Sequence, residues 1–272
     1  MKIENDRYFT PINIANWCWD KVDEVIGEEN ISDIIEPSCG DGAFYHHHSH
    51  VPTYGYEIIP SEELSKASEG YLVFIDDFLK ANITYMPGRL VIGNPPYGAR
   101  MTMAQKFYKK AVTIGDYVAF ILPISQLNNS VSLYEFDLIS STDLGIQKYS
   151  GRELHCCFNI YRIPETLELN SKPIYKLKDV TITRTGNKGF DEFEHDVRIC
   201  QWGDGTMGKI LKPDEHYAAE FKLKINNETL KDEILNFICT YDWNSNTVGI
   251  SAKKLQQWQI IKALKENIEG IQ

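Results

Sequence analysis

The chain has 272 residues and a formal net charge of −10 at pH 7; 43% of its residues are hydrophobic and 24% are charged. This length allows one sizeable domain, or one domain with a smaller partner, and the composition is that of a globular enzyme. The acidic balance argues against a general coat protein for nucleic acids. Within the chain, the segment 171–189 has five basic residues and one acid, so it either contacts phosphate groups or forms a solvated face.

The amino-terminal residues MKIENDRYFTP include acids where a secretory signal would need a basic flank and an apolar core. No apolar run reaches the length of a membrane span. Six cysteines occur without a C-x-x-C pair, which favours free thiols in a reducing compartment. We therefore expect a cytoplasmic protein without a membrane partner.

In chain order, the first half alternates strand-like and helix-like segments. Apolar runs predict strands at 31–38, 53–59, 70–76, 89–94, 116–123, 144–150 and 156–163. Amphipathic spacing predicts helices at 11–26, 61–68, 103–112 and 132–140. Strands that are apolar throughout and separated by helices indicate an α/β fold, doubly wound around a mostly parallel, seven-stranded sheet. No helix separates the last two strands, so we expect them to form a hairpin at one edge.

After Pro164 the apolar runs shorten and glycine-containing turns multiply. We place a domain boundary near 165, with a ligand-binding α/β domain at 1–165 and a small α+β module at 166–272. A final amphipathic helix is predicted at 251–269. Ligands of doubly wound sheets bind at the carboxyl ends of the strands, near the point where strand order reverses. The residues that follow each strand are therefore the candidate site.

Three of these strand ends carry polar residues typical of nucleotide sites. The first runs into EPSCGDGAF (36–44), where two glycines allow a tight turn but the Gly-Lys-Ser/Thr of a triphosphate loop is absent. Glu57 follows the second strand, where an acid accepts hydrogen bonds from ribose hydroxyls in α/β nucleotide folds; a surface glutamate is the alternative. Asp77 and Phe78 follow the third, and suit an exocyclic amine and a purine ring, although Phe78 alone is more often a core residue.

The fourth strand end reads Asn94-Pro95-Pro96-Tyr97. Proline has no backbone N–H, so this corner offers carbonyl acceptors without competing donors. Asn94 adds a side-chain carbonyl, and Tyr97 adds a flat ring on which another ring could stack. The combination indicates a rigid acceptor site for a planar –NH₂ group.

These segments occur in a fixed order: Thr10-Pro11, then Glu36 to Gly42, Glu57, Asp77-Phe78-Leu79 and Asn94 to Tyr97. The set resembles the S-adenosylmethionine-dependent DNA adenine-N6 methyltransferases, and its order is similar to that of their gamma class. The resemblance covers about residues 7–163, and no counterpart is recognised in 166–272. It implies a Rossmann-like class I methyltransferase domain that binds S-adenosylmethionine, followed by a target-recognition module.

The resemblance also implies roles for individual residues. Asn94, Pro95, Pro96 and Tyr97 would form the catalytic site, in which Asn94 and the Pro95 carbonyl bind the target amine while Tyr97 stacks on the flipped base. The residues expected at the cofactor are Tyr8, Thr10 and Pro11 at its methionine part, Glu36, Pro37, Ser38 and Gly40 at its amino-acid end, Glu57 and Ile58 at its ribose, Asp77 and Phe78 at its adenine, and Asn94. Double-stranded DNA would be the partner of an enzyme that is solitary, phage-borne or paired with a restriction endonuclease.

Methyl transfer to an adenine amine requires little from acids, bases or metals. The amine is a poor nucleophile because its lone pair is delocalised into the ring, and two acceptors can pyramidalise it and restore that density. The remaining contribution is alignment, which is worth several kcal/mol to an order of magnitude. His46 and His50 have the spacing of a helical metal pair, but we interpret the histidine cluster as a solvated helix end and expect no metal.

Several alternatives remain open. The Asn-Pro-Pro-Tyr motif also occurs in methyltransferases that modify a glutamine amide of peptide-release factors, and RNA adenine-N6 methylation uses the same chemistry on an unpaired base. A catalytically silent nucleic-acid-binding protein is a third possibility, although it would have no need of the intact motif. Four cations after the motif either contact the target strand or form an exposed helix face: Arg100, Lys106, Lys109 and Lys110.

Overall fold

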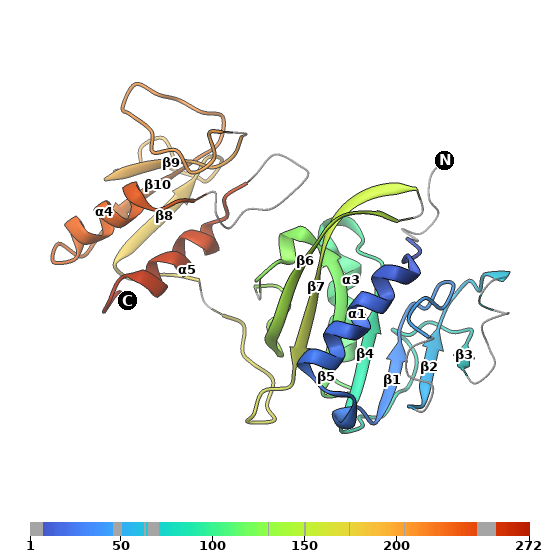
Figure 1. Ribbon diagram of the computed structural model, residues 1–272. Helices are drawn as coiled ribbons and strands as arrows, with labels where there is room; N and C mark the ends of the chain where they lie inside the picture. The colour runs from blue at the N-terminus through green and yellow to red at the C-terminus, as the bar shows by residue number, and fades with distance from the viewer. Residues whose placement is uncertain are drawn as a thin grey trace. The chain divides into compact units, whose positions relative to one another are not determined.

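The structure is a computed structural model that describes residues 8–45, 51–62, 64, 71–129, 131–149, 151–173, 175–203, 205–243 and 254–272 (Figure 1). The chain divides into two compact units, of which the first ends at Lys172 and the second begins at Pro173. Among the described residues, no helix is both long enough and apolar enough to cross a membrane.

The first unit is built on a seven-stranded sheet with the order β3-β2-β1-β4-β5-β7-β6. Its strands are β1 (Asp33–Glu36), β2 (Thr53–Tyr56), β3 (Leu72–Phe74), β4 (Arg89–Gly93), β5 (Tyr117–Pro123), β6 (Asp137–Tyr149) and β7 (Arg152–Arg162). The first five strands run parallel, and β7 runs antiparallel to both β5 and β6. The predicted mostly parallel sheet and its edge hairpin are confirmed. Strand order reverses between β1 and β4.

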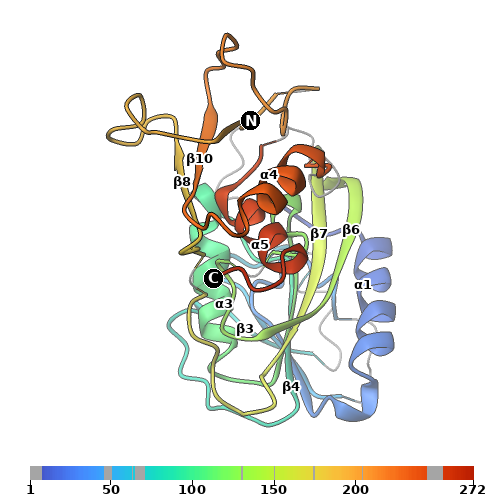
Figure 2. The same ribbon diagram turned by 90° about the vertical axis from the view of Figure 1, so that its left-hand side faces the viewer.

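Helices cover both faces of this sheet. α1 (Ile12–Val25) packs on one face and α3 (Thr102–Ala111) on the other, as Figure 2 shows. The alternation of side chains along β4 explains the two layers: Leu90 and Ile92 join the core under α1, whereas Val91 joins the core under α3. Among the described residues of this unit, short 3₁₀ turns occur at η2 (Glu28–Asn30), η3 (Ala99–Met101) and η4 (Ile124–Gln126).

The helix predicted at 132–140 is wrong. Leu133 and Phe136 are buried with the spacing of a helix face, but the chain is bent through 131–136 and enters β6 at Asp137. From Asp137 on, the segment pairs with β7, and this ladder overrides the local pattern. Most of the helix predicted at 61–68 lies outside the described residues, in which Glu62 and Leu64 are helical.

The second unit is a small α+β module, as the composition after residue 165 predicts. Its antiparallel sheet has the order β8-β10-β9, formed by β8 (Val180–Arg184), β9 (Val197–Cys200) and β10 (Glu220–Ile225). The helices α4 (Lys231–Thr240) and α5 (Gln257–Asn267) share one apolar core with this sheet. α5 lies inside the predicted 251–269, of which 251–253 fall outside the described residues. α4 was not predicted, although buried Ile234 and Ile238 have helical spacing.

A buried ion pair joins β1 to β4 at the amino-terminal edge of the first sheet. Arg89 Nε donates to Asp33 Oδ1 at 2.8 Å, and Nη2 donates to Oδ2 at 2.7 Å. Arg89 Nη1 also donates to the carbonyl oxygens of Thr84 and Ile114, at 2.6 and 3.2 Å. Asp33 and Arg89 are direct partners in the parallel ladder, so this bidentate contact fixes the register of the two strands.

Replacing Arg89 with methionine should lower the free energy of unfolding of the first unit by about 3–5 kcal/mol, because Asp33 would become an unpaired buried charge. The double replacement Asp33→Leu with Arg89→Met should cost less, since no charge then remains buried. Hydrogen–deuterium exchange of β1 and β4 amides across a urea series measures both effects. A double variant no more stable than Arg89→Met would show that the unpaired carboxylate is not the cause.

Candidate active site

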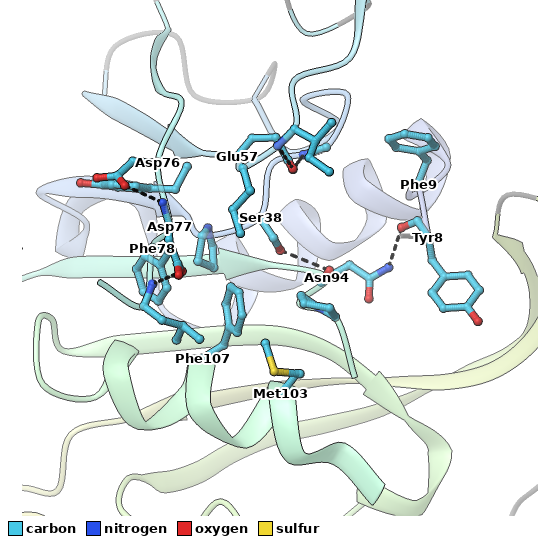
Figure 3. Close-up of a pocket in the computed structure, with 17 residues that line it drawn as sticks. Tyr8, Phe9, Ser38, Glu57, Asp76, Asp77, Phe78, Asn94, Met103 and Phe107 are labelled. Atoms are coloured by element: carbon cyan, nitrogen blue, oxygen red, sulfur yellow. Dashed lines mark hydrogen bonds between the residues drawn. The ribbon is translucent and has the colours of Figure 1, made fainter. Parts of the chain in front are cut away.

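A cavity of about 650 Å³ lies where β1, β2 and β4 end, at the reversal of strand order (Figure 3). This volume is within the range of small-molecule sites, and the position is the one at which doubly wound sheets bind ligands. The cavity is lined by Tyr8, Phe9, Pro37, Ser38, Gly40, Tyr56, Glu57, Ile58, Ile59, Asp76, Asp77, Phe78, Leu79, Asn94, Pro96, Met103 and Phe107.

The lining separates the predicted site residues into two groups. Those that line the cavity are Tyr8, Pro37, Ser38, Gly40, Glu57, Ile58, Asp77, Phe78, Asn94 and Pro96. Those that do not are Thr10, Pro11, Glu36, Pro95 and Tyr97. The lining residues to which the sequence interpretation gave no site role are Phe9, Tyr56, Ile59, Asp76, Leu79, Met103 and Phe107, of which Leu79 belongs to the motif set already named. The i, i+4 spacing of Met103 and Phe107 on the helix after the motif was a usable signal, because it places both on one face.

The turn after β1 is tied to the end of β2 by Glu57. The Gly40 N–H donates to Glu57 Oε2 at 2.9 Å, and the Ile59 N–H donates to Oε1 at 3.1 Å. Gly40 has a φ of 58°, in the left-handed region that glycine tolerates. The carboxylate is thus oriented by backbone amides at the cavity wall.

Glu36, at the end of β1, lies behind the cavity wall. Its side chain is 3% exposed, and Tyr71 Oη donates to Oε2 at 2.9 Å. Burial raises the pKa of Glu36 from 4.5 to about 8, and the nearby carboxylate of Asp41 adds to this shift while the Tyr71 bond opposes it. Glu36 is therefore mostly protonated at neutral pH.

Asp76 and Asp77 form an acidic turn after β3. Asp77 Oδ1 accepts from the Leu79 N–H at 3.0 Å, and Asp76 Oδ1 accepts from the Asp77 N–H at 2.7 Å. Phe78 is only 1% exposed, and its ring stacks on Phe107 of α3 with centroids 5.5 Å apart. Phe78 is thus both a core residue and part of an aromatic wall beside two carboxylates.

Asn94 follows β4, and its side-chain amide is held from one side. Nδ2 lies 3.4 Å from the Tyr8 carbonyl oxygen, a contact drawn in Figure 3, and 3.2 Å from Thr10 Oγ1. A carbonyl oxygen can only accept, so the amide nitrogen must face Tyr8. Oδ1 lies on the opposite side of the amide, where no described residue donates to it.

The two prolines after Asn94 present acceptors only. Pro95 is buried and Pro96 lines the cavity. No group in the described part of the chain donates to the Pro95 carbonyl. The corner therefore carries two neighbouring acceptors, Asn94 Oδ1 and Pro95 O, that the described residues leave unused.

Tyr97 is half-buried and packs against the cores on both faces of the sheet. Its Oη lies 3.5 Å from Cys156 Sγ on β7. Burial, and then the neighbouring Cys156, raise the pKa of Tyr97 well above its usual range, so the hydroxyl stays protonated. The Tyr97 carbonyl accepts from the N–H groups of Met103 and Ala104, at 3.1 and 3.4 Å, which joins the motif to the start of α3.

The turn between the motif and α3 is left-handed at three positions. The φ angles are 65° at Gly98, 53° at Arg100 and 65° at Met101. Such angles are costly for residues with a Cβ, and a Cβ added at Gly98 would lie 2.8 Å from Met103 Cγ. The Met101 side chain is buried while that of Arg100 is exposed. Packing of the Met101 side chain thus stabilises a strained turn directly after the motif.

The cations that follow the motif separate into two kinds. Arg100, Lys106 and Lys109 are exposed, whereas Lys110 Nζ donates to the Ala81 carbonyl at 2.8 Å. His46 and His50 lie outside the described residues. In the part of the chain that is described, no group of three or more side chains could hold a metal ion.

Stability should depend on the protonation of Glu36. Its pKa is raised on folding, so its contribution is fully present below about pH 4.5 and is lost as the pH rises through about 8. The slope is at most about 1.4 kcal/mol per pH unit. Glu36→Gln should remove this dependence and be more stable than the natural chain at pH 9, as measured by urea unfolding at pH 5 and pH 9. The exposed Glu165→Gln is the matched control, and equal pH dependence in both variants would refute the assignment to Glu36.

No family model matches the chain. Over 158 residues the chain is 28% identical to the type II methyltransferase M.CvrRI of Paramecium bursaria Chlorella virus XZ-6E, a match that covers 50% of this chain and 40% of that protein. A solved structure from Pyrococcus horikoshii, provisionally described as an RNA methyltransferase, matches with a TM-score of 0.48 and 15% identity over 60% of this chain and 89% of that chain. Magnesium protoporphyrin IX methyltransferase of Synechocystis PCC 6803 matches with a TM-score of 0.40 and 9% identity over 55% and 76%. The chain thus spans about 40% of its viral relative, and this similarity supports a relationship to the methyltransferases.

Proposed function

We propose that the chain is a site-specific DNA methyltransferase that transfers a methyl group from S-adenosylmethionine to the N6 amine of a flipped adenine. The observation that carries this proposal is the Asn94 corner. Its amide nitrogen is engaged by the segment 8–10, while Asn94 Oδ1, in a residue that lines the cavity, and the carbonyl of the adjacent Pro95 accept from no described residue. The similarity to a type II methyltransferase favours DNA as the polymer.

The cavity fits S-adenosylmethionine by the chemistry of its donors and acceptors. Glu57 would accept from the ribose hydroxyls, and Asp77 would accept from the adenine amine beside the rings of Phe78 and Phe107. The turn at Gly40, together with Pro37 and Ser38, would receive the amino-acid end. When bound, the cofactor supplies an activated methyl group on a sulfonium. Glu36 is not among the lining residues, so we propose that it supports this wall from behind.

At the target amine, Asn94 Oδ1 and Pro95 O would each accept one N–H. This double acceptance draws the nitrogen out of conjugation with the ring and aims its lone pair, and both acceptors are neutral, so no ionised base is required at the amine. Tyr97 is held to β7 through Cys156 and does not line the cofactor cavity. We propose that the Tyr97 ring stacks on the flipped base, on the side of the Asn94 corner that faces away from the cofactor cavity.

The second unit is proposed to recognise the DNA site. Lys176, Arg184 and Lys188 are exposed in the basic segment, and none of them makes an ion pair with a described residue. Exposed cations of this kind can contact phosphates without regard to sequence. The proposal covers both a solitary or phage-borne enzyme and an enzyme that is paired with a restriction endonuclease.

The polymer and base can be identified directly. The protein is incubated with tritiated S-adenosylmethionine and, separately, with unmodified duplex DNA of high sequence complexity, RNA and a peptide-release factor. We expect label in DNA, recovered as N6-methyladenine after digestion to nucleosides. Label confined to RNA or to protein would overturn the substrate, and N4-methylcytosine would overturn the base.

The acceptor role of Asn94 predicts a specific loss. Asn94→Ala should slow methyl transfer by about 10²- to 10³-fold, the effect of removing one preorganised hydrogen-bonding group from a reacting centre. Cofactor affinity, measured by calorimetry, should change by less than about tenfold, which corresponds to 1.4 kcal/mol. The exposed Asn82→Ala is the control and should behave as the natural chain. Full activity of Asn94→Ala would exclude the mechanism.

A further inference from the structure

The orientation of an asparagine amide is not set by covalent geometry. Rotation about χ2 is broad and roughly two-fold, so Oδ1 and Nδ2 can exchange places at little intrinsic cost. At the Asn94 corner the two orientations have opposite consequences. With Oδ1 toward the target, an amine finds an acceptor; with Nδ2 toward the target, two donors face each other and binding is lost.

Two groups of the segment that precedes α1 contact the Asn94 amide nitrogen. Tyr8 contributes its backbone carbonyl, and Thr10 contributes Oγ1, the nearer of the two at 3.2 Å. Thr10 is 8% exposed and does not line the cavity, so its hydroxyl is directed at Asn94 from behind. With the amide reversed, Oδ1 would face the Tyr8 carbonyl oxygen, so two acceptors would oppose each other, and Nδ2 would lose both of its contacts. The Thr10 hydroxyl can donate as well as accept, so the Tyr8 carbonyl selects the orientation and Thr10 holds the nitrogen in it.

The same segment is itself held in place from two other directions. Arg152, in the hairpin of β6 and β7, donates from Nη1 to Tyr8 Oη at 3.3 Å. Phe9 packs against the turn after β1, where a Cβ added at Gly40 would lie only 3.2 Å from Phe9 Cδ1. The segment that contacts Asn94 is therefore anchored to the sheet and to the cavity wall.

We propose that Thr10 is a positioning residue: its hydroxyl holds the Asn94 amide nitrogen in the orientation that the Tyr8 carbonyl selects, with Oδ1 turned toward the target amine. This role rests on the methyl transfer proposed above. This orientation favours substrates that present an –NH₂ group, because the orientation of the Asn94 amide determines whether the corner accepts or donates hydrogen bonds. It also differs from a cofactor contact, which is the role that the sequence resemblance implies for Thr10.

The kinetic test uses two substitutions at one position. Thr10→Val keeps the branched shape but removes the acceptor, and should lower kcat about tenfold, the effect of one lost neutral hydrogen bond. Thr10→Ser restores the hydroxyl and should recover kcat to within about threefold. Cofactor affinity should be the same in both. The exposed Thr113→Val, whose hydroxyl donates to the Lys110 carbonyl near the end of α3, is the control. A valine variant with full kcat, or one that weakens cofactor binding while kcat is kept, would overturn the role.

A second measurement is independent of activity. The side-chain amide resonances of Asn94 are identified in ¹H–¹⁵N spectra by their loss in Asn94→Ala. In Thr10→Val these protons should shift and exchange faster with solvent, and in Thr10→Ser they should stay as in the natural chain. Unchanged resonances in Thr10→Val overturn the positioning role whether or not the protein methylates DNA. Absence of methyl transfer by the natural chain, with the expected shifts present, would instead overturn only the proposed function.

Discussion

The geometry of the site depends on the register between β1 and β4, and the Asp33–Arg89 ion pair sets that register. The two residues are the first of their strands, so the pair lies at the amino-terminal edge of the sheet, opposite the carboxyl ends that line the cavity. Because both strands rise by the same distance per residue, fixing their first residues also fixes which residues emerge together at the other edge. The Glu36 turn and Asn94 therefore meet at the point where strand order reverses.

Above this frame, the site is assembled by polar contacts between segments that are distant in sequence. Glu57 joins the ends of β1 and β2 through Gly40, and Asn94 joins the end of β4 to the segment before α1. The Glu57 contacts fix the plane of its carboxylate through both oxygens, and the Asn94 contacts engage the nitrogen of its amide, with Oδ1 on the opposite side. Orientation is thus established before binding, which lowers the entropy cost of aligning the reacting groups.

The sequence was informative where one local property decided the outcome. Apolar runs located the strands, and parallel topology then required their carboxyl ends to share one edge, which brought Glu57, Asp77 and Asn94 to one cavity. The sequence was not informative where a contact with a residue distant in the sequence determined the structure. Residues 132–140 have a helical pattern but pair with β7, and nothing local indicates that Thr10 contacts a residue 84 positions away. Phe9 and Met103 were missed because their neighbours had stronger signals, not because their positions are unusual.

The protonation states around the corner agree with the proposed reaction, in which neutral acceptors are sufficient. Burial keeps Glu36 protonated at neutral pH and raises the pKa of Tyr97 well above its usual range, so neither group competes as a base. The carboxylates of Glu57 and Asp77 line the same cavity but are oriented by backbone amides on their own turns. Negative charge is thereby placed where a cationic cofactor would be held, and the corner at Asn94 stays uncharged. An amine that must keep its lone pair available for methyl transfer is better served by such dipoles, because an ionised base would bind its proton without redirecting the lone pair.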